Sequence, residues 1–188
     1  MSIDSRILRV GIEVEGEFRV YEHLAIEVTG SKYASLTQNE TIIKIANVDK
    51  EARDFLLTEG TPFNRVADRR RQRIFVEAGR QSYGVVRVFT GDITRVSVSQ
   101  PPDIDLEIRA LTSQYSKGDV FSYVAIATTR ASQIAEAAAD QLGLNLVFEA
   151  SDKNIQSFSY SGPALKMLDQ IQAFGGYDVY VDDEDLVL

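Results

Sequence analysis

A period of two in the alternation of apolar and polar residues dominates the first 111 residues of this 188-residue chain. Such a period places every second side chain on one face of an extended strand, whereas a helix repeats every 3.6 residues. The pair Glu15-Gly16 between two such segments marks a hairpin turn. Many short alternating strands predict a small antiparallel barrel or sandwich. The expected strands are 6–14, 16–22, 24–30, 41–47, 73–79, 85–91, 92–99 and 103–111.

One helix is expected within this first part, over residues 49–60. Asp49 can cap its beginning, because an Asp side chain accepts bonds from the free backbone N–H groups of a first turn. Gly60 can end it.

The period changes to that of helices after residue 111. Residues 131–143 place Ala131, Ile134, Ala138 and Leu142 on one face, and Gly143 ends this helix. Short apolar segments at 144–150, 155–161, 177–181 and 186–188 predict strands.

A second helix is expected over residues 162–176, with Pro163 in its first turn and glycines 175 and 176 at its end. Leu165, Leu168 and Ile171 form its expected buried stripe. The predicted order is β-α-β-β-α-β-β. The fold class is therefore mainly β with α+β: an antiparallel barrel or sandwich over residues 1–111, then a small α+β module over 112–188.

The composition argues against most enzyme and metal-site chemistry. The absence of cysteine removes disulfides, thiolate zinc sites and cysteine nucleophiles. His23 is the only histidine, and its alternating neighbours predict a solvent-facing position on a strand. The acidic turn Asp182-Asp183-Glu184-Asp185 lacks the spacing of a calcium loop. We predict no catalytic residue, no cofactor and no metal. The N-terminal residues lack a signal-peptide layout and no apolar run could span a membrane, so we expect a soluble, cytoplasmic chain without membrane contact.

Arginine is concentrated in one stretch, residues 65–80, of a chain with a net charge of −8. Three interpretations are open: a solvated loop, a nucleic-acid contact, or a clamp on carboxylates of a neighbouring subunit. The stretch has no aromatic residue between positions 65 and 73, which disfavours nucleic acid. We favour the inter-subunit clamp among the functional interpretations, since the planar guanidinium meets a carboxylate with two bonds. Its candidate residues are Arg69, Arg70, Arg71 and Arg73.

Two resemblances cover nearly the whole chain. Residues 43–47 (IKIAN), 78–80 (AGR), 89–93 (FTGDI) and 103–108 (DIDLEI) resemble recurring phrases in the first barrel of phage baseplate hub and tail-tube-like proteins. Residues 131–188 resemble the short N-terminal module of secretins and TonB-dependent receptors, and similar modules occur inside phage hubs. A barrel followed by this module is the order expected of a hub, because a secretin would not carry the barrel.

The resemblance implies a structural virion protein of the tail baseplate, made and assembled in the host cytoplasm. It would connect the tail tube to the spike and line a channel through which DNA passes without specific binding. The implied partners are copies of the chain in a ring, with a trimer favoured and a hexamer second, a tail tube protein, and another hub or spike protein.

One departure from the hub pattern bears on this stoichiometry. Hubs usually continue into a second barrel, so we expect that barrel from another chain or regard this sequence as a fragment. The alternatives are a secretin/TonB-type protein-binding module and a tail-associated cell-wall hydrolase.

Overall fold

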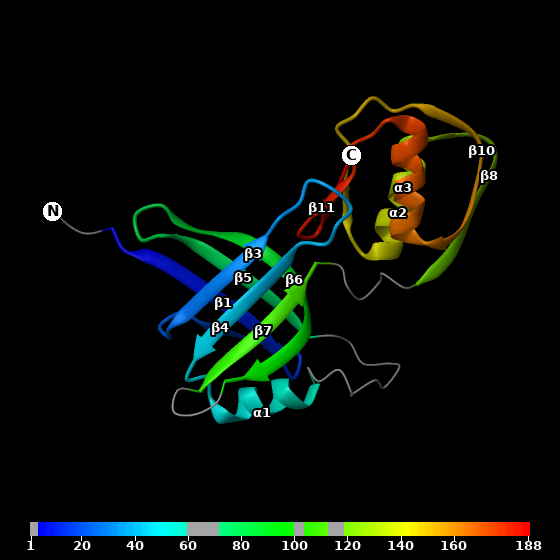
Figure 1. Ribbon diagram of the computed structural model, residues 1–188. Coiled ribbons are helices and arrows are strands. Elements are labelled where there is room, and N and C mark those ends of the chain that lie inside the picture. The colour runs from blue at the N-terminus through cyan, green and yellow to red at the C-terminus, as the bar shows by residue number, and fades with distance from the viewer. Residues whose placement is uncertain (1–3, 60–71, 100–103, 113–118) are drawn as a thin grey trace. The chain divides into compact units, whose positions relative to one another are not determined.

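The computed structural model describes residues 4–59, 72–99, 104–112 and 119–188 (Figure 1). The chain divides into two compact units, each described below by itself. The first comprises Met1–Ser31 with Asn39–Thr112, and the second Lys32–Gln38 with Ser113–Leu188. The segment Lys32–Gln38 thus belongs to the second unit although it connects two strands of the first.

The first unit is built on a seven-stranded antiparallel sheet in the order β2-β1-β5-β6-β7-β4-β3. Its mainly β character confirms the predicted fold class. Within the described residues no strand pairing joins β2 to β3, so the sheet is not closed into a barrel. The strands are β1 (Arg6–Val14), β2 (Glu17–Tyr21), β3 (Ile26–Ser31), β4 (Glu40–Ala46), β5 (Arg73–Arg80), β6 (Gly84–Val98) and β7 (Asp105–Leu111).

Strand β6 corrects the sequence prediction, which split it into two strands at residue 91. The strand is continuous and changes partner midway: it pairs with β5 up to Asp92 and with β7 from Asp92 onward. Gly91 stands at the change of partner, where an added Cβ would come 2.8 Å from the carbonyl oxygen of Leu111. Gly91, at which the predicted strand ended, therefore lies inside a continuous strand, and its missing side chain lets the backbone of β7 come close.

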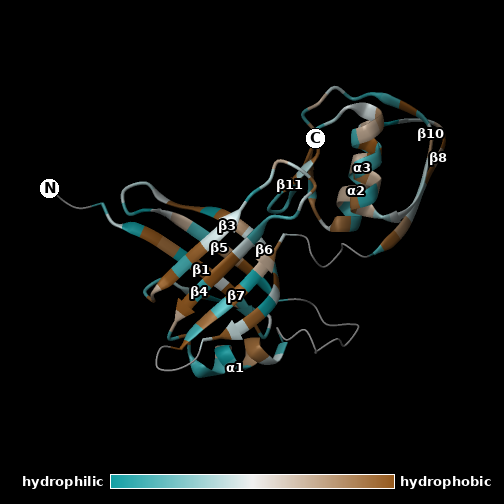
Figure 2. Ribbon diagram, in the orientation of Figure 1, coloured by the Kyte–Doolittle hydropathy of each residue, from teal (hydrophilic) through white to brown (hydrophobic). Residues whose placement is uncertain are grey.

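The core of the first unit collects the inward side chains of the alternating strands. Bands of apolar and polar colour alternate along β4 and β7 (Figure 2). Helix α1 (Lys50–Glu59) lies across one end of the sheet and buries Ala52 and Leu56 (Figure 1). Its predicted terminal residue Gly60 lies outside the described residues. The core residues from the sheet include Val10, Ile12, Val14, Ile43, Ile45, Ile74, Val76, Phe89, Ile93, Val96, Leu106, Ile108 and Ala110.

The second unit has the predicted β-α-β-β-α-β-β order. Strands β8 and β10 form an antiparallel pair, while β11, β12 and β9 form a small sheet in which β12 and β9 run parallel. The elements are β8 (Val120–Arg130), α2 (Ala131–Leu142), β9 (Asn145–Val147), β10 (Asn154–Pro163), α3 (Ala164–Gly175), β11 (Tyr180–Asp182) and β12 (Asp185–Val187).

The two helices of this unit bury the apolar faces that the sequence indicated, with two corrections in α3. All four predicted residues of α2 are buried, and Gly143 caps its end. In α3, Pro163 precedes the helix as its N-cap instead of lying in the first turn. Leu165 is only partly buried, and Met167 occupies the fully buried position instead. The buried stripe starts at Ala164 and continues with the i+3, i+4, i+7 spacing through Met167, Leu168 and Ile171. Leu165, about 100° around the helix from Ala164, therefore lies at the margin of the stripe.

Candidate assembly surface

The sheet of the first unit has two free edges, at β2 and at β3. In the described part of the chain, β2 pairs only with β1, and β3 pairs only with β4. These edge strands are five and six residues long. An edge strand presents a row of unpaired backbone N–H and C=O groups and is a template for pairing with another chain.

Strand β2 has its polar side chains on the core side and its apolar side chains on the outer side. Arg19 pairs across the hairpin with the buried Ile12, and Tyr21 pairs with the buried Val10. The residues between and beside them point the other way. Phe18 is 48% exposed and Val20 is 54% exposed. Because apolar residues normally face the core of a half-buried sheet, this arrangement is the reverse of the usual one.

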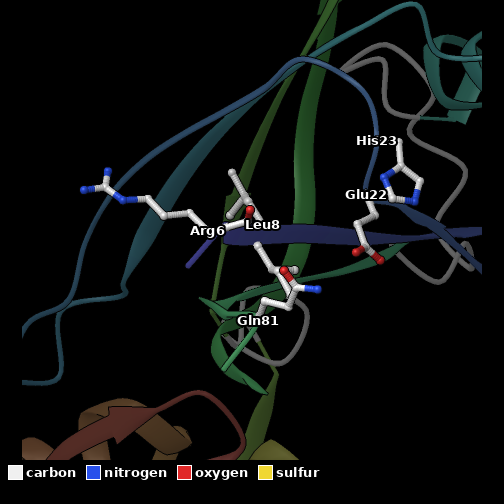
Figure 3. A pocket seen from close by; sticks show the side chains of 7 residues that line it. Arg6, Leu8, Glu22, His23 and Gln81 are labelled. Carbon is white, nitrogen blue, oxygen red and sulfur yellow. The ribbon is translucent and has the colours of Figure 1, made fainter. Parts of the chain in front are cut away.

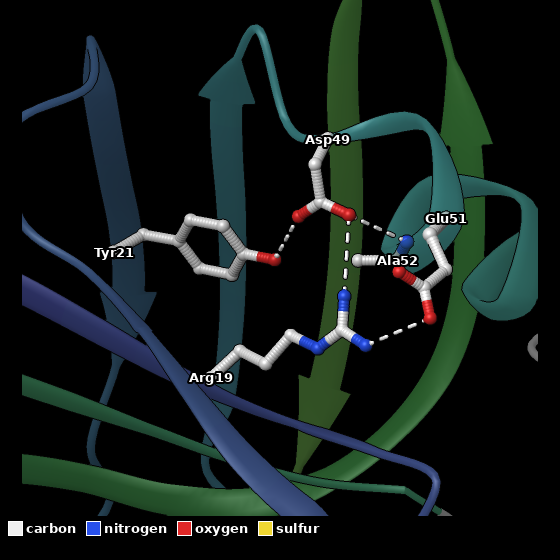
Figure 4. Close-up of polar contacts among 5 residues, drawn as sticks. All are labelled: Arg19, Tyr21, Asp49, Glu51 and Ala52. Carbon is white, nitrogen blue, oxygen red and sulfur yellow. Dashed lines mark hydrogen bonds and ion pairs between the residues drawn. The ribbon is translucent and has the colours of Figure 1, made fainter.

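A junction centred on Asp49 holds the core-side residues of β2 (Figure 4). Asp49 caps α1, as predicted, by accepting a bond from the Ala52 N–H at 2.9 Å. The Tyr21 hydroxyl donates to Asp49 Oδ2 at 3.0 Å, and Arg19 Nη1 donates to Asp49 Oδ1 at 3.2 Å. Arg19 Nη2 also reaches Glu51 Oε1 at 3.2 Å. Side chains thus fix this edge strand to the beginning of the helix.

The junction shifts two pKa values in directions that favour its bonds. The bond from the Ala52 N–H, followed by those from Tyr21 and Arg19, lowers the pKa of Asp49 against the opposing effect of burial. Burial is the main cause that raises the pKa of Tyr21 to about 12, and its bond to Asp49 adds to the shift. At neutral pH the carboxylate is therefore charged and the phenol is neutral, as donation from Tyr21 to Asp49 requires.

On the outer side, Phe18 belongs to a small aromatic cluster. Its ring lies 5.2 Å from that of Phe75 on β5, in a tilted arrangement. The Arg87 guanidinium lies over the Phe75 ring at 4.1 Å and forms an ion pair with Glu77 at 3.2 Å. The Phe75 ring covers Gly11 so closely that a Cβ there would come within 2.2 Å of it. Phe18 therefore rests on a fixed aromatic support.

Three of the four arginines predicted to form a clamp, Arg69, Arg70 and Arg71, lie outside the described residues. Arg73 is the exposed first residue of β5, and its backbone N–H donates to Glu13 Oε2 at 2.9 Å. The inter-subunit clamp stays a prediction.

The acidic turn of the second unit contacts a lysine of the same unit. Lys32 Nζ lies 2.5 Å from Asp182 Oδ1 and 3.1 Å from Asp183 Oδ2. These pairs attach the segment Lys32–Gln38 to the turn between β11 and β12. Because the side chains of these pairs are partly exposed, each pair contributes little to stability.

A shallow depression of the first unit contains the single histidine (Figure 3). His23 is exposed, as predicted, but lies in the connection between β2 and β3 and not on a strand. The neighbouring Glu22 is engaged by Arg9 at 2.7 Å. Among the residues described, no group of three or more His, Cys, Asp or Glu side chains could hold a metal ion. The depression is lined by Ser5, Arg6, Ile7, Leu8, Glu22, His23 and Gln81.

None of the helices in the described ranges is long and apolar enough to cross a membrane.

The overall architecture is shared with solved tail proteins. The tail protein from Neisseria meningitidis MC58 superposes with a TM-score of 0.63 at 13% identity, over 96% of this chain and 49% of that one. The 43 kDa tail protein of prophage MuSo2 from Shewanella oneidensis gives a TM-score of 0.56 at 12% identity, over 95% of this chain and 53% of that one. A chain of the Francisella PdpA-VgrG complex gives 0.51 at 10% identity, over 97% of this chain and 29% of that one. These likenesses establish the fold.

A match to a protein family defines the class, which is that of structural proteins of phage tail baseplates. Residues 7–188 match the family described as baseplate hub gp41, and the chain belongs to this family. It is therefore a structural, non-enzymatic component of the virion tail. None of the curated proteins compared with the chain matches it in sequence. The chain spans about half the length of the two tail proteins and under a third of the Francisella chain.

Proposed function

We propose that the chain is a hub subunit that connects the tail tube to the spike. A ring of copies, completed by partner chains, lines the channel through which DNA passes. The observation that carries this proposal is the pair of free sheet edges, β2 and β3, in a chain of the baseplate hub family. Pairing across these edges joins neighbouring sheets into one wall.

Two different edges on one sheet suit a ring. When edge β2 of one copy meets edge β3 of the next, the contact is head-to-tail, and its repetition closes a ring if the rotation permits. A trimer completed by a partner chain is our first choice and a plain six-fold ring the second. The likeness to a chain of the PdpA-VgrG complex supports assembly with other proteins of the tail and spike.

The charge of the chain supports passage of DNA without retention. The net charge is −8, and the part after residue 111 holds 11 acidic residues against 4 basic ones. An acidic surface repels the phosphate backbone, whereas each neutralised phosphate would release counterions and tighten binding. Residues 1–111, which carry the sheet of the proposed wall, are close to neutral, with 17 acidic residues against 16 basic ones. Neither part of the chain therefore has an excess of positive charge that would hold DNA.

The solution mass of the assembled protein tests the proposal. The full chain, alone and mixed with the tube protein of its own tail, is examined by native mass spectrometry over a range of concentrations. We expect a closed oligomer of three or six copies, formed alone or on addition of the tube protein. A chain that stays monomeric in both conditions at every concentration contradicts the proposed ring.

A further inference from the structure

The segment that connects β3 to β4, Lys32–Gln38, is packed in the second unit although both strands belong to the first. We call this segment the strap. Because of the strap, the backbone passes between the two units at three places: after Ser31, after Gln38 and after Thr112. Units joined by a single linker move relative to each other by default. The strap adds two connections that oppose such motion.

The three connections leave the first unit from one row of its sheet. Ser31 at the end of β3 pairs with Glu40 at the start of β4, and Glu40 pairs with Leu111 at the end of β7. Directly beyond this row, the Asn39 N–H donates to Thr112 Oγ1 and the Thr112 N–H donates to the Asn39 carbonyl oxygen, each at 3.1 Å. Asn39 and Thr112 are both buried. The ends of β4 and β7 are therefore fixed to each other, and a hinge lies beyond them.

The contacts of the strap inside the second unit combine an apolar and an ionic part. The side chain of Leu36 is partly buried against the core of that unit. Lys32 Nζ forms ion pairs with both Asp182 and Asp183. These belong to the four successive acidic residues 182–185, whose like charges repel one another, so a bound lysine relieves that repulsion. Partly exposed ion pairs are weak and are screened by salt, so a modest change of charge or salt shifts the strap between a docked and a released state.

We propose that the strap is a salt-sensitive latch, which limits the motion of the second unit about the ends of β3, β4 and β7. While Lys32 is bound to Asp182 and Asp183, three backbone connections join the two units. When the strap is released, it becomes a loop of the first unit, and only the connection after Thr112 remains. The pairing of β4 with β7 does not involve the strap, so the sheet is the same in both states. This inference goes beyond the proposed function and does not depend on the ring.

Trypsin measures release of the strap directly, because it cleaves after a lysine only when that side chain enters its specificity pocket. The full chain is compared with Asp182→Asn/Asp183→Asn, which removes both charges at almost constant shape. Asn also tolerates the positive φ of 55° at Asp183. The matched control, Asp140→Asn/Asp178→Asn, makes the same change at two exposed aspartates of the second unit that form no ion pair within the described ranges. Mass spectrometry follows cleavage after Lys32, normalised to cleavage of a free peptide of residues 30–35.

The first double variant is expected to be cleaved after Lys32 about three- to tenfold faster than the original chain, because two ion pairs are lost. The control is cleaved at the original rate. Salt at about 1 M accelerates cleavage of the original chain and changes that of the first double variant little, since the variant has no ion pair left to screen. Equal rates for the original chain and the first double variant overturn the latch.

Spin labels measure how freely the second unit moves. The chain has no cysteine, so Glu17→Cys and Gln141→Cys, at one exposed position in each unit, carry the only labels. Pulsed electron paramagnetic resonance of the labelled chain, diluted with unlabelled chain, gives the distribution of the distance between the labels within one molecule. The latch predicts a broader distribution in Asp182→Asn/Asp183→Asn and in Lys32→Gln than in the original chain, and an unchanged width in the control. All variants are expected to melt like the original chain, because surface changes usually alter stability by about 0.5 kcal/mol or less.

The two measurements test the two halves of the inference. If cleavage after Lys32 becomes faster while the distance distribution keeps its width, the strap does not restrain the second unit and the inference fails. A distribution of the original chain that is equally wide at low and high salt also overturns it, because the ion pairs then do not hold the latch. The proposed ring is judged separately by the mass of the assembly, and neither result changes that judgement.

Discussion

At the scale of single residues, Asp49 connects the beginning of a helix with the edge of a sheet. One carboxylate accepts bonds from the Ala52 N–H, the Tyr21 hydroxyl and Arg19. The cap could be predicted, because an Asp before a helical segment is a common signal. The contacts with β2 could not, because nearly thirty residues separate the partners and no local pattern links them.

Replacing Asp49 with Ala is expected to lower the free energy of unfolding by about 1–2 kcal/mol, the usual effect of losing a helix cap. Asp49→Asn, which keeps an acceptor for the Ala52 N–H, is expected to cost less. Urea denaturation of the two variants and the original chain measures the difference. Equal stability of all three proteins would show that the Asp49 junction contributes nothing to the free energy of unfolding.

The raised pKa of Tyr21 predicts a loss of stability in alkali. Below about pH 10 its phenol is protonated in both the folded and the unfolded chain, so its contribution is fully present. Between about pH 10 and 12 the unfolded chain releases the proton while the folded chain keeps it, so the free energy of unfolding falls. Denaturation at several pH values should show a steeper fall in this window for the original chain than for Tyr21→Phe. Parallel curves would contradict the assigned shift.

At the scale of elements, the sequence predicted strands and helices well where periodicity alone decides them. The helices of the second unit and the alternating strands of the first follow directly from their apolar spacing. The sequence also contained the information on which side of β2 each side chain points to. The two-residue turn Glu15-Gly16 sets the hairpin register, which places Arg19 opposite Ile12 and turns Phe18 outward. Alternation alone does not decide which of its two faces a strand buries.

Strand β6 shows what periodicity cannot reveal. Glycine is common in turns, so the sequence at Gly91 predicts the end of a strand. Only the close approach of Leu111 from the neighbouring strand shows that the chain continues through Gly91 as one strand. A tertiary contact decides that β6 continues past Gly91, and such a contact cannot be inferred from the neighbouring residues in the sequence.

Gly91→Ala is expected to destabilise the first unit by about 1–3 kcal/mol, the usual cost of inserting a group into a filled space. The new Cβ would lie 2.8 Å from the backbone carbonyl of Leu111, which cannot move without disturbing the pairing of β6 with β7. Gly16→Ala, at a turn where no atom lies within 4 Å, provides a comparison that carries backbone strain but no clash. Thermal unfolding of both variants measures the two effects. A Gly91→Ala protein as stable as the original would refute the close approach.

At the scale of the whole molecule, the net negative charge is concentrated in the later part of the chain and arginine in the earlier part. The predicted clamp uses this asymmetry, since arginines of one copy would meet carboxylates of a neighbour. Replacing Arg69, Arg70 and Arg71 together with Ala is expected to abolish assembly. Surface changes of this kind usually alter stability by about 0.5 kcal/mol or less, so the melting curve should stay normal. Normal assembly of the triple variant, checked by native mass spectrometry, would eliminate the clamp.

The central claim is that neighbouring subunits complete the free edges of this sheet. A three-dimensional image of the purified assembly, at a resolution that separates strands, tests the claim most directly. The account predicts that β2 and β3 of each copy both lie beside strands of neighbouring chains, either copies or partner chains, in a continuous wall around an open channel. An assembly in which both edges face solvent, or a chain found only as single molecules, would contradict it.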